Sequence, residues 1–282
     1  MISTPTQLVP FFTRSHLHLF TRLPIKTYLC DLNLPSNRFL QNKCPMKRSD
    51  LFVLGAIILI LLPFFISPPV LSAYKELNAA HAYMMSFIKF AVLATFGECI
   101  GLRIRKGVYN KPGFGILPRA IVWGFLGIGI KIAFVIFGEG APMMLKTMGV
   151  NFPEANPGNI LRQTGFSWLK LLAAFSVSAT MNLIFAPVFM AFHRITDMHI
   201  MNTSGTLKGF FTPIPFGKYI HETDWLSFWN FVIVKTIPFF WIPAQAVNFM
   251  LPEDYRILVA AVYGVILGVL LSVAILMQQK RS

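Results

Sequence analysis

The sequence predicts an all-α fold, a polytopic membrane helix bundle of about six transmembrane helices. Hydrophobic residues make up 55% of the 282 positions and charged residues only 13%, whereas soluble domains are about 25% charged. Several apolar stretches approach the roughly 20 residues that cross a bilayer. The 25 lysines and arginines, set against 11 acids, lie mostly between those stretches. Together these observations exclude an ordinary soluble enzyme.

The first 45 residues differ in composition from the rest of the chain. They combine Ser, Thr and Asn with one acid, Asp31, and five basic residues: Arg14, Arg22, Lys26, Arg38 and Lys43. This basic profile resembles an organelle transit sequence. In the interpretation that we prefer, Met46-Lys47-Arg48 is the natural start, and residues 1–45 are a disordered extension or a start-site artefact. Residues 46–282 then form the membrane bundle.

Six stretches are long and apolar enough to be the spans: 50–67, 83–102, 120–137, 167–190, 225–250 and 257–277. If the N-terminus is cytoplasmic, alternate loops hold twelve basic residues on one side and four on the other. Because Lys and Arg concentrate in cytoplasmic loops, this split supports an even number of spans. Both termini are therefore expected on the cytoplasmic or matrix side.

The segment between the third and fourth spans is not expected to cross the membrane. Pro142, Pro153 and Pro157 interrupt it, and Glu139 and Glu154 are charged. Within it, 141–150 is expected to lie flat in the membrane interface as a short amphipathic helix, or to form a surface loop.

The residues that usually carry catalysis or metal binding form no recognisable constellation. The sequence has no HExxH, GxSxG or Walker motif. Cys30, Cys44 and Cys99 match no disulfide or zinc spacing, and His193 and His199 are read as surface residues of a loop. We therefore expect no enzyme activity, no metal and no cofactor. The excess basic charge is expected to set membrane topology, and nucleic-acid binding is not expected.

Three ionisable residues inside the predicted spans carry more information. A charge at the bilayer centre costs a few kcal/mol, so such residues usually have a function. Lys131 lies twelve residues after Arg119 and Lys235 ten after Trp225, or about 15–18 Å deep at 1.5 Å per residue. We expect Lys131 and Lys235 near the midplane, where they face a wet interior or pair with Glu98.

The fifth span adds two prolines and two amides. Pro238 and Pro243 are expected to bend it, because each removes a helix hydrogen bond. Gln245 and Asn248, three residues apart, project from one face. This pair either joins helices by hydrogen bonds or lines a polar path, and both interpretations stay open.

The C-terminal part also carries an ordered pattern of spaced residues: Trp241-x-Pro243-x-Gln245-x-x-Asn248-Phe249, then Pro252-x-x-x-Arg256. This order resembles the C-terminal signature of the Mpv/PMP family, small multi-pass proteins of peroxisomal and inner mitochondrial membranes. Upstream, Pro187 and Asp197 bracket a weaker match to the family's box Gly-Pro-x-x-His-x-Trp-Tyr-x-x-Leu-Asp.

The resemblance is partial. Met190 stands where the family has His, and Phe192 and His193 replace Trp-Tyr. The similar region is about 182–282, with the strongest match in the last forty residues. We therefore expect a divergent, bacterial member of the family.

The resemblance implies an integral membrane protein linked to small-solute permeability, without an established reaction. It implies functional roles for the residues of the pattern, and Arg256 is expected to pair with Glu253 or Asp254. We expect a small-solute channel or permeability regulator whose polar path includes Lys131, Lys235, Gln245, Asn248 and Glu98. The alternative is a non-conducting membrane scaffold.

The expected partner is the lipid bilayer, and a homo-oligomer is left open. The solute is not named by the sequence. The expected location is a bacterial inner membrane, with a mitochondrial or peroxisomal membrane as the alternative.

Overall fold

The structure is a computed structural model that describes residues 47–279. Within this range the chain forms helices joined by turns and bends, with no strand. The expectations for residues 1–45, a disordered extension or a transit sequence, concern a part of the chain outside the described residues. The account that follows therefore concerns the unit that begins at Met46.

Five helical segments of the described chain are long and apolar enough to cross a membrane. They are α3 (Ala82–Lys106), α4 (Ile116–Thr147), α5 (Trp168–Asn202), the fifth span Trp225–Met250 and α10 (Glu253–Gln279). A sixth candidate is the pair α1 (Arg48–Ile66) and α2 (Pro68–Ala80), which meet at 87°. The predicted all-α membrane bundle is thus confirmed, with five spans, or six if the bent pair counts as one.

The bend between α1 and α2 follows from the local sequence. Pro68 and Pro69 occupy the first turn of α2, where their missing N–H groups cost nothing. Ser67 before them is extended, as residues preceding proline prefer to be, so α1 ends there.

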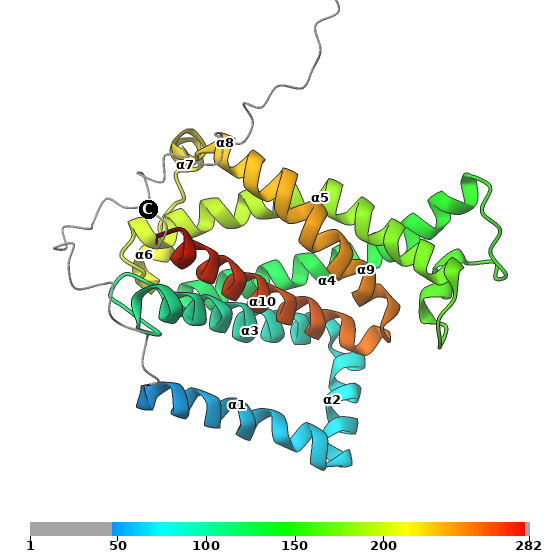
Figure 1. Cartoon of the computed structure of the whole chain (residues 1–282), viewed down its shortest axis with the longest axis horizontal. Coiled ribbons are helices and arrows are strands. Elements are labelled where there is room, and N and C mark those ends of the chain that lie inside the picture. The colour runs from blue at the N-terminus through cyan, green and yellow to red at the C-terminus, as the bar shows by residue number, and fades with distance from the viewer. Residues whose placement is uncertain (1–46, 280–282) are drawn as a thin grey trace, which may run out of the picture. The chain divides into compact units, whose positions relative to one another are not determined.

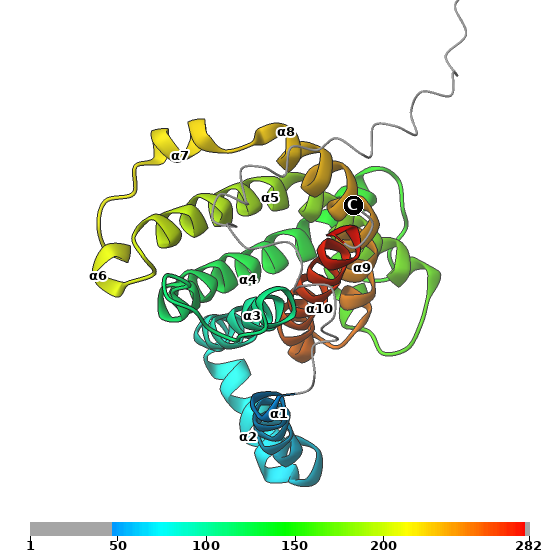
Figure 2. The ribbon, with the colours of Figure 1, turned by 60° about the vertical axis from the view of Figure 1, so that its left-hand side comes forward.

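Helices α3, α4 and α5 lie side by side, with α10 packed on α3 and α9 (Ile242–Met250) packed on α5 (Figures 1 and 2). Close packing of α3 on α4 depends on a glycine. A Cβ at Gly127 would lie 2.7 Å from Cβ of Phe90 and 2.8 Å from the Ser86 carbonyl oxygen. The Ser86 hydroxyl donates to the Gly127 carbonyl oxygen at 2.6 Å. Small residues that let backbones approach in this way are typical of membrane helices.

The connections alternate between two ends of the bundle. At what we call the proximal end, Lys47 Nζ donates to the Gly107 carbonyl oxygen at 2.9 Å, and Arg103 pairs with Asp50 at 2.6 Å. At the distal end, the 3₁₀ helix η4 (Pro157–Arg162) meets the turn between α9 and α10. The start of α1 and the end of α10 both lie at the proximal end (Figure 1).

Two predicted boundaries are wrong. Helix α4 continues through Pro142 to Thr147, so the expected interfacial helix or loop at 141–150 is largely the end of α4. A proline removes only one helix hydrogen bond, and burial of Pro142 offsets that loss. Helix α5 also continues beyond the predicted 167–190 to Asn202, so His193 and His199 lie on a helix rather than in a loop.

The fifth span is continuous but not a regular α-helix. It consists of α8 (Trp225–Ser227), the π-helix η5 (Phe228–Trp241) and α9, and it crosses as one segment. Pro238 lies inside the wider winding of η5 and Pro243 in the first turn of α9, and the bends expected at these prolines stay predictions. In a π-helix each N–H reaches back five residues, and such segments occur mostly at functional sites. The short helices α6 (Leu207–Phe210) and α7 (Phe216–Glu222) lie in the preceding connection.

Candidate functional site

Arg119, in the first turn of α4, joins two carboxylates inside the proximal end of the bundle. Its Nη1 pairs with Oε2 of Glu98 on α3 and with Oδ1 of Asp197 on α5. The arginine side chain is 8% exposed and the two carboxylates are 22% and 20% exposed. We call these residues, together with Trp123 and His193, the proximal charge cluster. It ties α3, α4 and α5 together.

The remaining contacts of Arg119 also fix its position. Its Nε donates to the Phe114 carbonyl oxygen at 2.8 Å, and its guanidinium lies 4.7 Å from the centre of the Phe114 ring. A planar guanidinium can contact carboxylates and a carbonyl oxygen along its edge and an aromatic ring with its face. Arg194 of α5 also interacts electrostatically with Asp197, so two arginines accompany the two carboxylates.

Glu98 holds the two aromatic members of the cluster. The Trp123 indole donates to Oε1 of Glu98 at 2.6 Å, and Nε2 of His193 lies 3.6 Å from the same oxygen. The Trp123 and His193 rings are 4.4 Å apart. The prediction that Glu98 pairs with Lys131 or Lys235 is therefore wrong, since its basic neighbours are Arg119 and His193.

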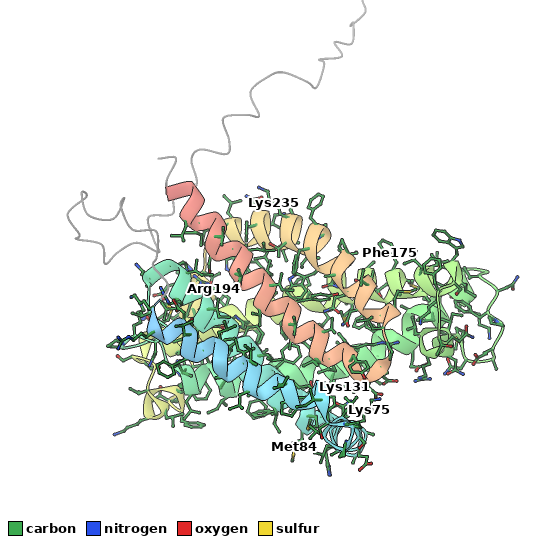
Figure 3. The ribbon with its side chains drawn as sticks, turned by 60° about the horizontal axis from the view of Figure 1, so that its bottom comes forward. Lys75, Met84, Lys131, Phe175, Arg194 and Lys235 are labelled. Carbon is green, nitrogen blue, oxygen red and sulfur yellow. The ribbon has the colours of Figure 1, made fainter. Side chains whose placement is uncertain are left out.

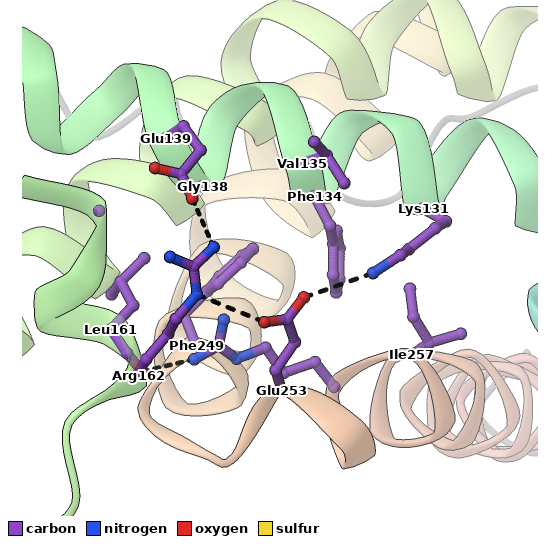
Figure 4. A pocket seen from close by; sticks show the side chains of 12 residues that line it. Lys131, Phe134, Val135, Gly138, Glu139, Leu161, Arg162, Phe249, Glu253 and Ile257 are labelled. Carbon is purple, nitrogen blue, oxygen red and sulfur yellow. Dashed lines mark hydrogen bonds and ion pairs between the residues drawn. The ribbon is translucent and has the colours of Figure 1, made fainter. Parts of the chain in front are cut away.

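At the distal end, charged side chains surround a cavity of about 60 Å³. Glu253, the first residue of α10, lies between Lys131 of α4 and Arg162 of η4, which point toward it from opposite sides (Figure 4). Lys131 Nζ is 3.5 Å from Oε1 of Glu253, and Arg162 Nε is 3.6 Å from Oε2. Arg162 pairs more closely with Glu139, at 2.7 Å. We call this group the distal cavity.

The contact with Glu253 shows where Lys131 lies relative to α10, while its expected depth in the membrane stays a prediction. Because Glu253 begins α10, Lys131 lies level with the distal end of α10 and not with its middle. Lys131 lies halfway along α4, which has 32 residues, so the start of α10 lies beside the middle of α4. A lysine near a bundle end can reach the membrane surface along its flexible stem.

Gln245 and Asn248 form a buried hydrogen-bonded pair that we call the amide brace. Asn248 Nδ2 donates to Oε1 of Gln245 at 2.8 Å and to the Arg256 carbonyl oxygen at 2.9 Å. Of the two interpretations of these amides, the one in which they join helices accounts for these contacts. The two cavities described above and below are not lined by either residue.

Arg256 lies beside the brace but does not form the expected ion pair. Its Nε donates to the Leu251 carbonyl oxygen at 3.0 Å, and its Nη2 donates to the Leu161 carbonyl oxygen at 2.6 Å. Its guanidinium is 5.5 Å from the Phe249 ring centre. Arg256 thus connects the turn between α9 and α10 to η4 instead of pairing with Glu253 or Asp254.

The other predicted residues are spread over the bundle. Lys235 is exposed and projects from η5 at the edge of the bundle, so it does not face the interior (Figure 3). Pro243 and Pro252 are exposed, while Pro187 and Trp241 are half-buried. Of the residues taken from the family pattern, four contact one another around the α9–α10 turn: Gln245, Asn248, Phe249 and Arg256. Asp197 lies apart from them, in the proximal charge cluster.

Between the two charged regions lies an apolar layer that includes Phe90 and Ala94 of α3, Leu126 of α4 and Met181 of α5. Phe90 stacks on Trp123 with ring centres 6.5 Å apart. The hollow at the proximal charge cluster leaves no space for a water molecule. The cavity at the distal end and the hollow at the proximal charge cluster have no lining residue in common.

Sequence reasoning missed four residues of these regions. Arg119 and Arg162 were counted as topology charges, and His193 was read as a surface residue. Trp123 was not considered for a site. One signal was available: Arg119 and Trp123, four residues apart on a helix, share a face. His199, also expected at the surface, is buried, with Nε2 3.1 Å from the Phe210 carbonyl oxygen.

No group of three His, Cys, Asp or Glu side chains within residues 47–279 is arranged to hold a metal ion. The chain matches no protein-family model, no curated protein and no solved structure. The geometry of the helices and their charged residues therefore carries the functional argument.

Proposed function

We propose that this multi-pass membrane protein is a divergent member of the Mpv/PMP family that lets small solutes cross the bilayer, and that the structure is its closed conformation. The supporting observation is a pair of charged regions, one at the start of α4 around Arg119 and one that contacts the middle of α4 at Lys131, with apolar residues between them. The family assignment rests on the sequence pattern, whose Asn248, Phe249 and Arg256 meet at the α9–α10 turn.

The energetic argument is that buried charge is costly in a membrane protein. Charged side chains inside a bundle are retained mainly where they bind, conduct or switch. Hydrophobic constrictions between wetter regions are a known way to close a path, because water leaves a narrow apolar segment. The layer around Phe90 and Leu126 is apolar and is followed on the distal side by the cavity at Glu253, and widening it together with separation of the dry proximal charge cluster should open the path.

Flux measurements in liposomes test the proposal. The reconstituted protein should release a small entrapped solute faster than empty vesicles do, and Phe90→Ala should increase the rate severalfold. The matched control is Val92→Ala, which shortens an exposed side chain of the same helix. If the protein and Phe90→Ala both release solute no faster than empty vesicles, the proposal is refuted.

A non-conducting scaffold is the second candidate, and the amide brace favours it. Asn248 holds α9 to α10 through a buried hydrogen bond to the Arg256 carbonyl oxygen and is itself held by Gln245, as residues with a purely structural role are. In that case flux is absent from every variant, and substitutions at the brace change only stability.

We propose the bacterial inner membrane as the location, with both termini on the cytoplasmic side. The support is the excess of basic residues in the loops of the proximal end. Labelling of single cysteines introduced at Arg105 and Arg162 tests this, since only the second should react from outside intact cells.

A further inference from the structure

The distal cavity has an excess of positive charge. Its lining contains three cations, Lys131, Arg162 and Arg256, but only two carboxylates, Glu139 and Glu253. The cations come from three elements, α4, η4 and α10. An uncompensated charge at a largely buried position is costly, so a bound anion would stabilise this arrangement.

Arg256 is the cation of the cavity with no carboxylate at ion-pair distance among the described residues, although Glu253 acts on it electrostatically from farther away. It is 6% exposed and lines the cavity. Two of its N–H donors bind carbonyl oxygens of Leu251 and Leu161, and none of the ion pairs found among residues 47–279 includes it. Its remaining donors are therefore available to a ligand in the cavity.

The existing ion pairs across the cavity are loose. The Glu253 carboxylate oxygens lie 3.5 Å from Lys131 Nζ and 3.6 Å from Arg162 Nε. Both distances are longer than the roughly 2.7–3.2 Å of a good N–H to oxygen hydrogen bond. Arg162 and Glu253 are both 51% exposed in their side chains, so either can turn aside. An incoming anion can thus replace Glu253 as the partner of Lys131 and Arg162.

The cavity also has suitable size and shape. One water molecule needs about 10–15 Å³ of this kind of space, and the cavity has about 60 Å³. A Cβ at Gly158 would overlap the Glu139 carboxylate, so glycine is what leaves room there. Three cations from different elements that line one cavity suit an anion with several oxygens, such as a tetrahedral phosphate, better than a planar carboxylate.

From these observations we infer that the distal cavity binds a phosphate group through Lys131, Arg162 and Arg256. The phosphate is carried by an anionic phospholipid or is free in water. The lining also includes the apolar residues Phe134, Phe249 and Ile257, and η4 lies outside the spans, so we place the cavity near lipid head groups. The site goes beyond the proposed function, because it binds phosphate whether or not the protein lets solute cross the membrane.

Thermal unfolding of the full chain in maltoside detergent tests the site, with added inorganic phosphate compared with chloride at equal ionic strength. A second arm compares micelles containing phosphatidic acid with micelles containing diacylglycerol, which has no phosphate. Stabilisation by phosphate identifies a free ligand, and stabilisation by phosphatidic acid alone identifies a lipid. Absence of both effects overturns the inference.

Three variants make the test specific. Arg162→Gln should weaken binding about tenfold or more, since a hydrogen bond to a charged group is lost. Glu253→Gln should strengthen binding, because it removes the internal competitor. Lys146→Gln is the matched control, since exposed Lys146 lies at the same end and contacts Ala155 instead of the cavity. Equal weakening by Arg162→Gln and Lys146→Gln, or weaker binding in Glu253→Gln, overturns the inference. A failure of solute flux leaves these results unchanged.

Discussion

The proximal charge cluster and the distal cavity contain the same kinds of residue but differ in how firmly water is excluded. Arg119 is 8% exposed, between two carboxylates and without space for water. Arg162 and Glu253 are each 51% exposed, 3.6 Å apart, beside a cavity. The comparison teaches that a buried arginine and its carboxylates hold helices together rigidly, because their attraction is strong where water is excluded. At a solvent-accessible site the same residues can change partners and bind a ligand.

The largest loss of stability should come from substitutions in the proximal charge cluster. Arg119→Met leaves two carboxylates buried without their cation, and breaking a buried pair in this way costs about 3–5 kcal/mol. Thermal unfolding in detergent measures the loss. Arg105→Met, at an exposed arginine of the same end, is the control and should change stability little. Equal losses in the two variants would contradict the assignment of a buried joint.

The apolar layer that separates the two regions should respond next. Gly127→Ala places a methyl group against Phe90 and the Ser86 carbonyl, and overpacking of this kind costs about 1–3 kcal/mol. Gly129→Ala is the matched control, because the nearest atom to its added Cβ is 3.9 Å away. Urea or thermal unfolding of both proteins gives the comparison. Should Gly129→Ala be the more harmful change, the described packing of α3 on α4 is wrong.

The amide brace sharpens the contrast between structural and functional polar groups. Asn248→Leu leaves the Arg256 carbonyl oxygen and Gln245 Oε1 without their donor, at a cost of about 1–3 kcal/mol. Solute flux per folded molecule should stay unchanged. Val247→Ala, at an exposed neighbour, should affect neither quantity. A change of flux in Asn248→Leu without a loss of stability would assign the brace to the path instead.

Removal of the loosely held carboxylate should affect stability much less. Glu253 is half exposed, and such pairs contribute under about 1 kcal/mol. Glu253→Gln should therefore unfold close to the native temperature, whereas Glu98→Gln in the proximal charge cluster should unfold earlier. The same unfolding assay compares the two directly, and a reversed order would break the distinction between the regions.

The smallest effect concerns Asp224, which lies outside both regions and caps the fifth span. Hydrogen bonds from Ser227 lower the pKa of Asp224 below its usual 3.8. Because the folded pKa is depressed, the stabilisation is present near neutral pH and is lost as pH falls through the folded pKa. Asp224→Asn should thus lower the unfolding temperature slightly at pH 7, with the difference from the native protein shrinking as the pH falls below the usual 3.8 of the carboxyl group. A difference that persists at low pH would exclude this origin.

The helices were predictable because a bilayer-spanning segment must be long and apolar, a property that adjacent residues share. Five predicted spans correspond to α3, α4, α5, Trp225–Met250 and α10. The ends were less predictable. Pro142 was expected to break the helix but is buried inside α4. Helix α5 continues to Asn202 through residues that the sequence predicts to form a loop.

The charged regions were only partly predictable. Glu98 and Lys131 were recognised as costly charges, yet each has a partner other than the expected one. Lys235, judged from depth alone, is exposed on η5, because residue counting gives a position along a helix but not the direction in which a side chain points.

The sequence by itself determined that this is a bundle of membrane-crossing helices, because hydropathy and span length depend on local composition. It also determined which residues are costly to bury. Only the tertiary structure decided that Arg119 joins Glu98 to Asp197 and that Lys131 and Arg162 meet at Glu253. The physical reason is that ion pairs depend on the relative shift and rotation of neighbouring helices, which packing around glycines such as Gly127 sets and which no single helix encodes.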